Sequence, residues 1–252
     1  MDILTSFDYL CNEPFFIDGI GNVKCPTLRD IRKTTHQVFS IYVNSLTISL
    51  DDYLKTYGLK EKYDLLSDEE KLKNGLFNLL LHGNTQLLYG VLNFFLIDDF
   101  EYNQKTAEID IFTASDDKKN IIGHLNSQNF DLFRNELQCV LGIKNLEESE
   151  PKFKNSLAEK MFAKLKKHNE KLKKKSDENY ELDNMIKKYC THNKVGINIL
   201  NVWDMTYYQF MAMFNEYCNG RQYDFNDMMA ANTFQYKKSS DYKPMDYMKR
   251  LK

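Results

Sequence analysis

The chain has 252 residues, of which 42% are hydrophobic and 13% aromatic, and it carries a formal net charge of −2. This length allows one large domain or two small ones with a real core, and the small charge excludes a whole-protein attraction to nucleic acid or acidic membranes. Five scattered cysteines without a C-x-x-C spacing, and the lack of a membrane-length apolar run or a basic leader, predict a soluble cytoplasmic protein with reduced thiols.

The first predicted elements are a hairpin and a helix. Two short apolar runs flank Asp18-Gly19 in residues 15–23, which is typical of a short β-hairpin or a tight turn. Thr27 and Asp30 have the spacing of a capping box, so we expect a helix with one apolar stripe over residues 28–46. A shorter helix over residues 50–57 should end at a glycine.

The middle of the N-terminal part contains the strongest core signal. Ser67 and Glu70 form a second capping box before a leucine-rich helix that should stop near residues 82–84. The next predicted helix, residues 85–97, is apolar on most sides and should be the core helix of this part. Three short strands are then expected at residues 100–102, 108–113 and 120–122, and Gly142 should end the helix that follows them.

An acidic run at residues 145–150, followed by a proline, marks a boundary. It separates an N-terminal part, residues 1–145, from a C-terminal helical part, residues 151–252. Within residues 152–175 the apolar side chains keep a helical spacing while lysines fill the other faces, which predicts a long basic helix. One interpretation is a nucleic-acid contact, because clustered lysines release counterions from phosphates. We favour a solvated helix face, since neither arginines nor an aromatic stacking platform accompany the lysines.

The segment 201–236 contains the only tryptophan, Trp203, and the clearest helix start in the chain. Thr206 and Gln209 form a third capping box, and apolar residues then recur at intervals of three and four. Gly220 is expected to end this helix as a C′ residue, and Asp224 to cap a second one. The pattern therefore predicts a helical hairpin.

No sequence motif indicates a catalytic or cofactor site. The chain lacks a phosphate-binding loop, a zinc-protease helix and a nucleophile elbow, and its five histidines are widely separated. Acidic residues around the predicted strands could gather a divalent metal as two-metal nucleases do, namely Asp98, Asp99, Glu101, Glu108 and Asp110. Because exposed strands and turns carry such acids routinely, we predict no enzymatic role, no cofactor and no metal.

Segments at the two ends of the chain carry a family resemblance. EPFFIDGIGNVKCPTLRDI, together with ILNVWDMTYYQFMAMFNEY and YDFNDMMAA, resembles the tail assembly chaperones of long-tailed phages and prophages from low-GC Gram-positive bacteria. The resemblance is strongest in the W-D-x-T-x-Y-Q segment and adds little in the middle of the chain. It implies a helical protein of the infected or lysogenic host cytoplasm that binds the tape measure protein and recruits tail tube subunits.

Methionine-rich helices suit such a carrier, because methionine is flexible and polarizable and adapts to a partner's apolar stripe. Methionines and aromatic residues concentrate in the predicted hairpin, although for any one of them ordinary core packing is the simpler interpretation. The same surface would also permit self-association. The side chains predicted to bind the partner are Trp203, Tyr207, Phe210, Met211, Phe214, Met228 and Met229.

Together these patterns predict a mainly α-helical protein with a minor β-hairpin element, with the α+β class as the alternative. The leading function is a non-enzymatic tail assembly chaperone with no membrane or nucleic-acid partner. The alternatives are a nucleic-acid-binding phage protein that acts through the lysine-rich helix 152–175 and a metal-dependent nuclease.

The lysine-rich helix provides a test. If it is a solvated face, neutralising Lys166, Lys167, Lys173 and Lys174 together should leave protein-partner binding intact and hardly change the free energy of unfolding, because exposed charges contribute modestly. Partner pull-down, thermal unfolding and DNA and RNA binding at several salt concentrations measure these effects. Salt-sensitive nucleic-acid binding that disappears in the variant would make the segment a nucleic-acid contact.

Overall fold

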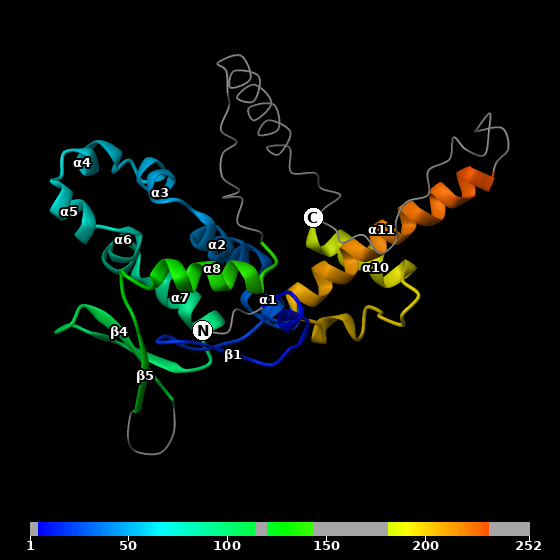
Figure 1. Cartoon of the computed structure of the whole chain (residues 1–252), viewed down its shortest axis with the longest axis horizontal. Helices are drawn as coiled ribbons and strands as arrows, with labels where there is room; N and C mark the ends of the chain where they lie inside the picture. Colours follow the sequence, from blue (N-terminus) through cyan, green and yellow to red (C-terminus); the bar gives the residue numbers. More distant parts are fainter. Residues whose placement is uncertain (1–4, 114–119, 144–180, 232–252) are drawn as a thin grey trace, which may run out of the picture. The chain divides into compact units, whose positions relative to one another are not determined.

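A computed structural model describes residues 5–113, 120–143 and 181–231 of the chain (Figure 1). This described part is mainly helical with two small antiparallel sheets, which confirms the predicted fold class. None of its helices is long and apolar enough to cross a membrane. The lysine-rich segment 152–175 lies outside the described residues, so the predicted basic helix stays a prediction.

The described residues divide into two compact units, and each is considered by itself. The first contains the residues up to 143 together with Asp204–Gln209. The second contains residues 181–203 and 210–231. The short segment Asp204–Gln209 therefore belongs to the first unit although it lies far from the rest of that unit in sequence.

Two antiparallel sheets of the first unit follow the predicted strands. The expected hairpin forms around Gly19, whose φ of 73° lies in the left-handed region that favours glycine. The three-stranded sheet has the order β3-β4-β5, with a register irregularity between Ile111 and Phe112 of β4. The strands are β1 (Phe15–Ile17), β2 (Gly21–Val23), β3 (Asp99–Asn103), β4 (Glu108–Thr113) and β5 (Asn120–Leu125).

β5 is longer than predicted because it packs on the turn of the first hairpin. A Cβ atom at Gly123 would lie 2.3 Å from the carbonyl oxygen of Ile20, so only glycine fits there. The next backbone amide, of His124, donates to the carbonyl oxygen of Gly19 at 2.9 Å. This contact holds the end of β5 and thereby fixes the position of His124.

The helices of the first unit are shorter and more numerous than the apolar stripes predicted. The expected helix over 28–46 is broken at Thr35, which has a positive φ of 78° and whose hydroxyl caps the next helix. The expected leucine-rich helix after Ser67 is broken at Asn74, and Gly75 begins the next one. These helices are α1 (Leu28–Thr34), α2 (His36–Thr47), α3 (Leu50–Thr56), α4 (Lys60–Asp64), α5 (Asp68–Lys73), α6 (Leu76–Gly83), α7 (Thr85–Phe95) and α8 (Phe130–Val140), with a short 3-10 turn, η1 (Asp8–Leu10), before them.

The core of the first unit forms around α7, as the sequence predicted. Leu92 and Phe95 of this helix are fully buried, and the Phe94 ring packs on Phe39 of α2 at 5.8 Å between centroids. Helix α8 also stabilises α2. The side chains of Gln138 and Arg134 donate to the backbone carbonyl oxygen of Leu46, in the last turn of α2, at 2.7 and 2.9 Å. Carbonyl groups in the last turn of a helix otherwise lack partners, so these bonds cap α2.

The beginnings of α1 and α11 (Tyr207–Ala231) lie side by side in the first unit. The Leu28 amide donates to the Met205 carbonyl oxygen at 3.0 Å. The Tyr207 amide donates to the Pro26 carbonyl oxygen at 2.8 Å, which completes a short antiparallel pairing. Backbone groups that precede two helices far apart in sequence thus satisfy each other.

Both helices begin with the capping boxes that the sequence predicted. Thr27 accepts from the Asp30 amide, and the Asp30 carboxylate accepts from the Thr27 amide. Thr206, which is fully buried, accepts from the Gln209 amide at 3.1 Å, and the Gln209 side chain accepts from the Thr206 amide at 2.9 Å. Each start therefore has reciprocally satisfied backbone donors.

The second unit contains α10 (Leu182–His192), residues of the 3-10 turn η3 (Val202–Asp204) and most of α11. The predicted helical hairpin is wrong, because α11 is one continuous helix through Gly220 and Asp224. Gly220 does not adopt a positive φ, and the residues after it, Arg221 and Gln222, are good helix formers. An isolated interior glycine costs less than breaking such a helix would.

A glycine-to-alanine substitution tests the continuous helix. Gly220→Ala should raise the free energy of unfolding by about 0.5–1 kcal/mol, because alanine loses less backbone entropy in a helix and a Cβ at this position meets no atom within 4 Å. Chemical denaturation of the two proteins measures the difference. A loss of stability would mean that the helix ends here in a left-handed residue, where alanine is strained.

Candidate protein-binding surface

The first half of α11 packs against α10 through aromatic rings within the second unit. The Tyr189 ring of α10 lies 5.9 Å from the Phe210 ring and 5.7 Å from the Tyr217 ring, both edge to face. Phe214 stacks on Phe210 at 6.0 Å and is also buried. Such aromatic contacts add to the burial of apolar area, so this seam is the core of the unit.

The face of α11 that forms this seam continues beyond it. Residues 210, 214, 217, 221, 224 and 228 follow the alternating four- and three-residue spacing that keeps side chains on one face of a helix. Past Tyr217, however, the apolar residues become exposed: Phe225 beside this face is 50% exposed and Met228 is 64% exposed. Figure 1 shows the orange-red end of α11 extending beyond α10. The second half of α11 thus presents apolar side chains to solvent.

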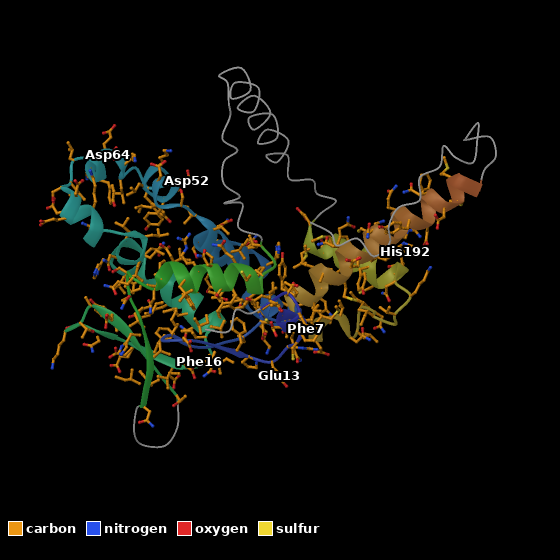
Figure 2. The ribbon with its side chains drawn as sticks, viewed as in Figure 1. Phe7, Glu13, Phe16, Asp52, Asp64 and His192 are labelled. Atoms are coloured by element: carbon orange, nitrogen blue, oxygen red, sulfur yellow. The ribbon has the colours of Figure 1, made fainter. Side chains whose placement is uncertain are left out.

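A groove of about 300 Å³ lies where the two halves of α11 meet. The end of α10, including His192 (Figure 2), forms one wall, and α11 forms the other. Gly220 leaves this stretch of α11 without a side chain. The groove is lined by Tyr189, His192, Asn193, Lys194, Val195, Met213, Glu216, Tyr217, Gly220, Arg221 and Asp224.

One buried polar atom in the wall of the groove has no partner among the described residues. The Tyr189 hydroxyl is buried and forms no hydrogen bond within residues 5–113, 120–143 and 181–231. Burial, followed by the nearby Cys190 thiol, raises the pKa of this tyrosine above its ordinary value. A buried polar group without a partner is costly, so such groups require an explanation. A donor or acceptor from a bound segment would remove that cost if it reached the hydroxyl.

The structure separates the seven predicted binding residues into different environments. Phe210 and Phe214 are buried in the α10–α11 seam, and Met228 is exposed. The other four are half-buried. Among these, Trp203 donates from Nε1 to the Ile199 carbonyl oxygen at 2.8 Å, and Tyr207 packs its ring at 5.3 Å from Phe39 in the first unit. The remaining half-buried residues are Met211 and Met229. The predicted set is therefore not one contiguous surface.

Sequence reasoning missed several exposed apolar residues of the second unit. The predicted hairpin would place Phe225 in the apolar stripe of its second helix, whereas the continuous α11 leaves Phe225 exposed. Extending the helical spacing through Gly220 would have placed it beside the seam. The loop between α10 and η3 contributes further exposed side chains, namely Val195, Ile199 and Leu200.

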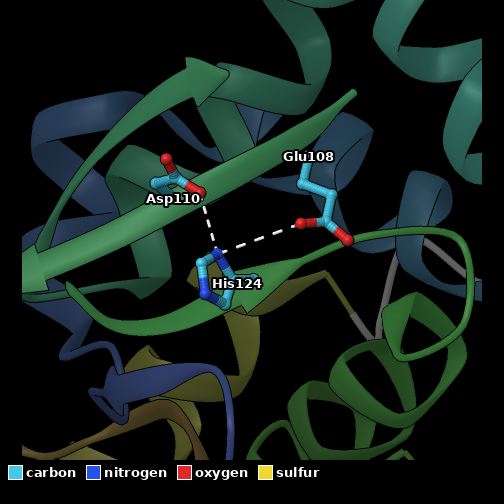
Figure 3. Close-up of side chains that lie close together, drawn as sticks. All are labelled: Glu108, Asp110 and His124. Atoms are coloured by element: carbon cyan, nitrogen blue, oxygen red, sulfur yellow. Dashed lines mark hydrogen bonds and ion pairs between the residues drawn. The ribbon is translucent and has the colours of Figure 1, made fainter. Parts of the chain in front are cut away.

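The acidic residues considered for a metal site do not all lie together. The Asp98 carboxylate accepts from the Asn22 backbone amide at 2.6 Å and from the Asn22 side chain at 3.0 Å, so Asp98 holds the middle of β2. Glu108 and Asp110 lie instead beside His124 (Figure 3). Sequence reasoning missed His124, because the predicted third strand stopped two residues before it.

Residues 173–252 match a family model described as the YomV second domain. This family is associated with phages and prophages, so the match supports a phage protein. The matched segment is less than half of the chain, and it includes α10, α11 and the W-D-x-T-x-Y-Q segment. No curated protein and no solved structure matches the chain.

Two substitutions separate the core seam from the exposed surface. Phe210→Ala should lower the free energy of unfolding by about 3–5 kcal/mol, since it leaves a cavity in the aromatic seam. Met228→Ala should change it by less than about 0.5 kcal/mol, because the side chain is mostly in water. Denaturant unfolding measures both changes. Similar losses of unfolding free energy in the two variants would contradict the assignment of Phe210 to the core and of Met228 to the surface.

Proposed function

We propose that this phage protein is a non-enzymatic tail assembly chaperone that binds an apolar helical partner along the second half of α11. The partner assigned by the family resemblance is the tape measure protein, and tail tube subunits are recruited to the complex. The protein acts in the cytoplasm of the infected or lysogenic host. The observation that carries this proposal is that α11 continues past its aromatic seam with α10 and there exposes the apolar side chains of Phe225 and Met228.

The exposed half of α11 has the chemistry that such a partner requires. A tape measure protein is a long helix with apolar stripes, which aggregate until tube subunits enclose them. Phe225 and Met228 offer apolar area, and methionine adapts to side chains of varied shape. An amphipathic helix recognises a helical partner through apolar side chains spaced three and four residues apart, and Phe225 lies three residues before Met228 and four before Met229.

The groove at Gly220 gives the same surface a second contact. Val195 and Met213 on its walls are partly exposed apolar side chains, and Arg221 and Asp224 add charges of both signs. A partner side chain that enters the groove would be fixed in register by these polar groups. Apolar contacts supply most of the binding free energy, while the charged groups select the partner.

The two segments that carry the family resemblance support the proposal by their position. Pro26 and Leu28 from the N-terminal segment pair with Tyr207 and Met205 from the C-terminal segment. The resemblance therefore covers the paired starts of α1 and α11 as well as much of α11.

Co-expression tests this function. A tape measure protein from the same genome that aggregates alone should become soluble with the chaperone, and the pair should co-purify with several chaperone copies per tape measure chain. Because the contacts are apolar, the complex should survive moderate salt. The double variant Phe225→Ser, Met228→Ser should lose this solubilising effect, since both side chains lie on the proposed surface.

Leu65→Ser is the matched control. Leu65 is a highly exposed apolar residue of the first unit, so the substitution removes exposed apolar area elsewhere and should leave solubilisation unchanged. Circular dichroism of each variant separates lost binding from unfolding. The proposal fails if the tape measure protein still precipitates beside the folded wild-type protein, or if this protein is a stoichiometric component of finished tails.

A further inference from the structure

Glu108, Asp110 and His124 converge on one face of the three-stranded sheet (Figure 3). Glu108 and Asp110 are two positions apart in β4, so their side chains lie on the same face, and His124 of β5 is directly opposite Asp110. Residues 109 and 111 of β4 point the other way and are fully buried. The antiparallel register before the irregularity at Ile111 therefore places two carboxylates and an imidazole on the face away from that core.

The three groups are close enough to share one ligand. One oxygen or nitrogen atom from each lies within 4.8 Å of the others. His124 Nδ1 is 2.8 Å from Asp110 Oδ1 and 4.0 Å from Glu108 Oε2. In a tetrahedral zinc site the ligand atoms are about 3.3 Å apart, so small side-chain rotations would bring these three to that spacing.

Asparagine side chains outside the cluster orient both carboxylates. Asn103 donates to Asp110 Oδ2 at 2.9 Å, and Asn126 donates to Glu108 Oε1 at 2.9 Å. In each carboxylate the atom within reach of His124 is the other oxygen, Oδ1 or Oε2. Outer hydrogen bonds of this kind fix the orientation of metal-binding side chains and tune their affinity.

The charge of the cluster is incompletely balanced. In the described parts of the chain, neither Glu108 nor Asp110 forms an ion pair with a lysine or arginine, and His124 is their only ion-pair partner. Their side chains are only 29% and 15% exposed, so water screens them incompletely. Two carboxylates that share one site repel each other, and a divalent cation would neutralise both.

We propose that Glu108, Asp110 and His124 bind a divalent first-row transition-metal ion, for which Zn²⁺ is the best match. One imidazole and two carboxylates suit Zn²⁺, whereas Ca²⁺ requires six to eight oxygen ligands and Mg²⁺ prefers oxygen ligands alone. The ion takes the place of the proton shared between His124 and Asp110 and links β4 to β5. Water completes the coordination. This site departs from the sequence-based expectation of no metal and is independent of the surface on α11.

Titration of the purified full-length protein with Zn²⁺ tests the proposal. Isothermal calorimetry should show one ion per chain, and Co²⁺ should give the visible absorption of a low-symmetry, four-coordinate site. Mg²⁺ should not compete at equal concentration. His124→Gln should weaken Zn²⁺ binding more than the roughly 10–100-fold expected from loss of an outer partner, such as Asn126→Ala.

The matched control is His36→Gln, which removes an exposed histidine of α2 that has no part in the cluster. It should bind Zn²⁺ as the wild type does. His124 is 48% exposed, so its substitution should leave the fold intact, and circular dichroism checks this. The proposal is overturned if the wild type does not bind Zn²⁺, or if a folded His124→Gln variant binds it with unchanged affinity, which would assign the ion to the cysteines or to other histidines.

Discussion

The pairing between the segments that precede α1 and α11 is the constraint on which the first unit depends. It joins Pro26 and Leu28 to Tyr207 and Met205, although about 180 residues of chain separate them. Thr206 at its centre is a fully buried polar residue, and its hydroxyl is satisfied only if the first turn of α11 is in place. Burial of an unsatisfied hydroxyl is costly, so helix start and segment pairing must form together.

This coupling explains why a helix as long as α11 begins at a defined residue. An isolated helix frays at its ends, but the start of α11 is held by two backbone hydrogen bonds and a capping box. Its first half is then buried against Tyr189 in the second unit, and its second half carries exposed Phe225 and Met228. The start of α11 is thus held by hydrogen bonds, whereas its second half exposes apolar side chains. The proposed partner binds to this second half.

Local signals in the sequence were the ones that predicted the structure well. The capping boxes at Thr27, Ser67 and Thr206 each depend on two side chains three residues apart, and all three form. The turn at Gly19 and the core helix α7 were likewise readable from nearby residues. Gly220 misled the prediction because a glycine after an apolar stripe resembles a helix end, whereas neighbouring helix formers carry α11 through it.

Features that depend on contacts between distant segments were not predictable in the same way. The extension of β5 to His124 follows from the close approach of Gly123 to Ile20, which no local pattern reports. Without that extension, His124 could not be placed opposite Asp110. Helical spacing alone places Phe210, Phe214 and Met228 on the same face of α11. Phe210 and Phe214 are buried and Met228 is exposed because α10 covers only part of that face.

Hydrogen exchange of the protein with and without the tape measure protein tests the central claim most directly. Amides of a helix exchange when the helix opens locally, and a bound partner that stabilises the helix slows this opening. Binding along the second half of α11 predicts new protection in residues 221–229, with little change in the buried α7 of the first unit. A complex in which residues 221–229 exchange as fast as in the free protein, while protection appears elsewhere, would contradict the binding surface described here.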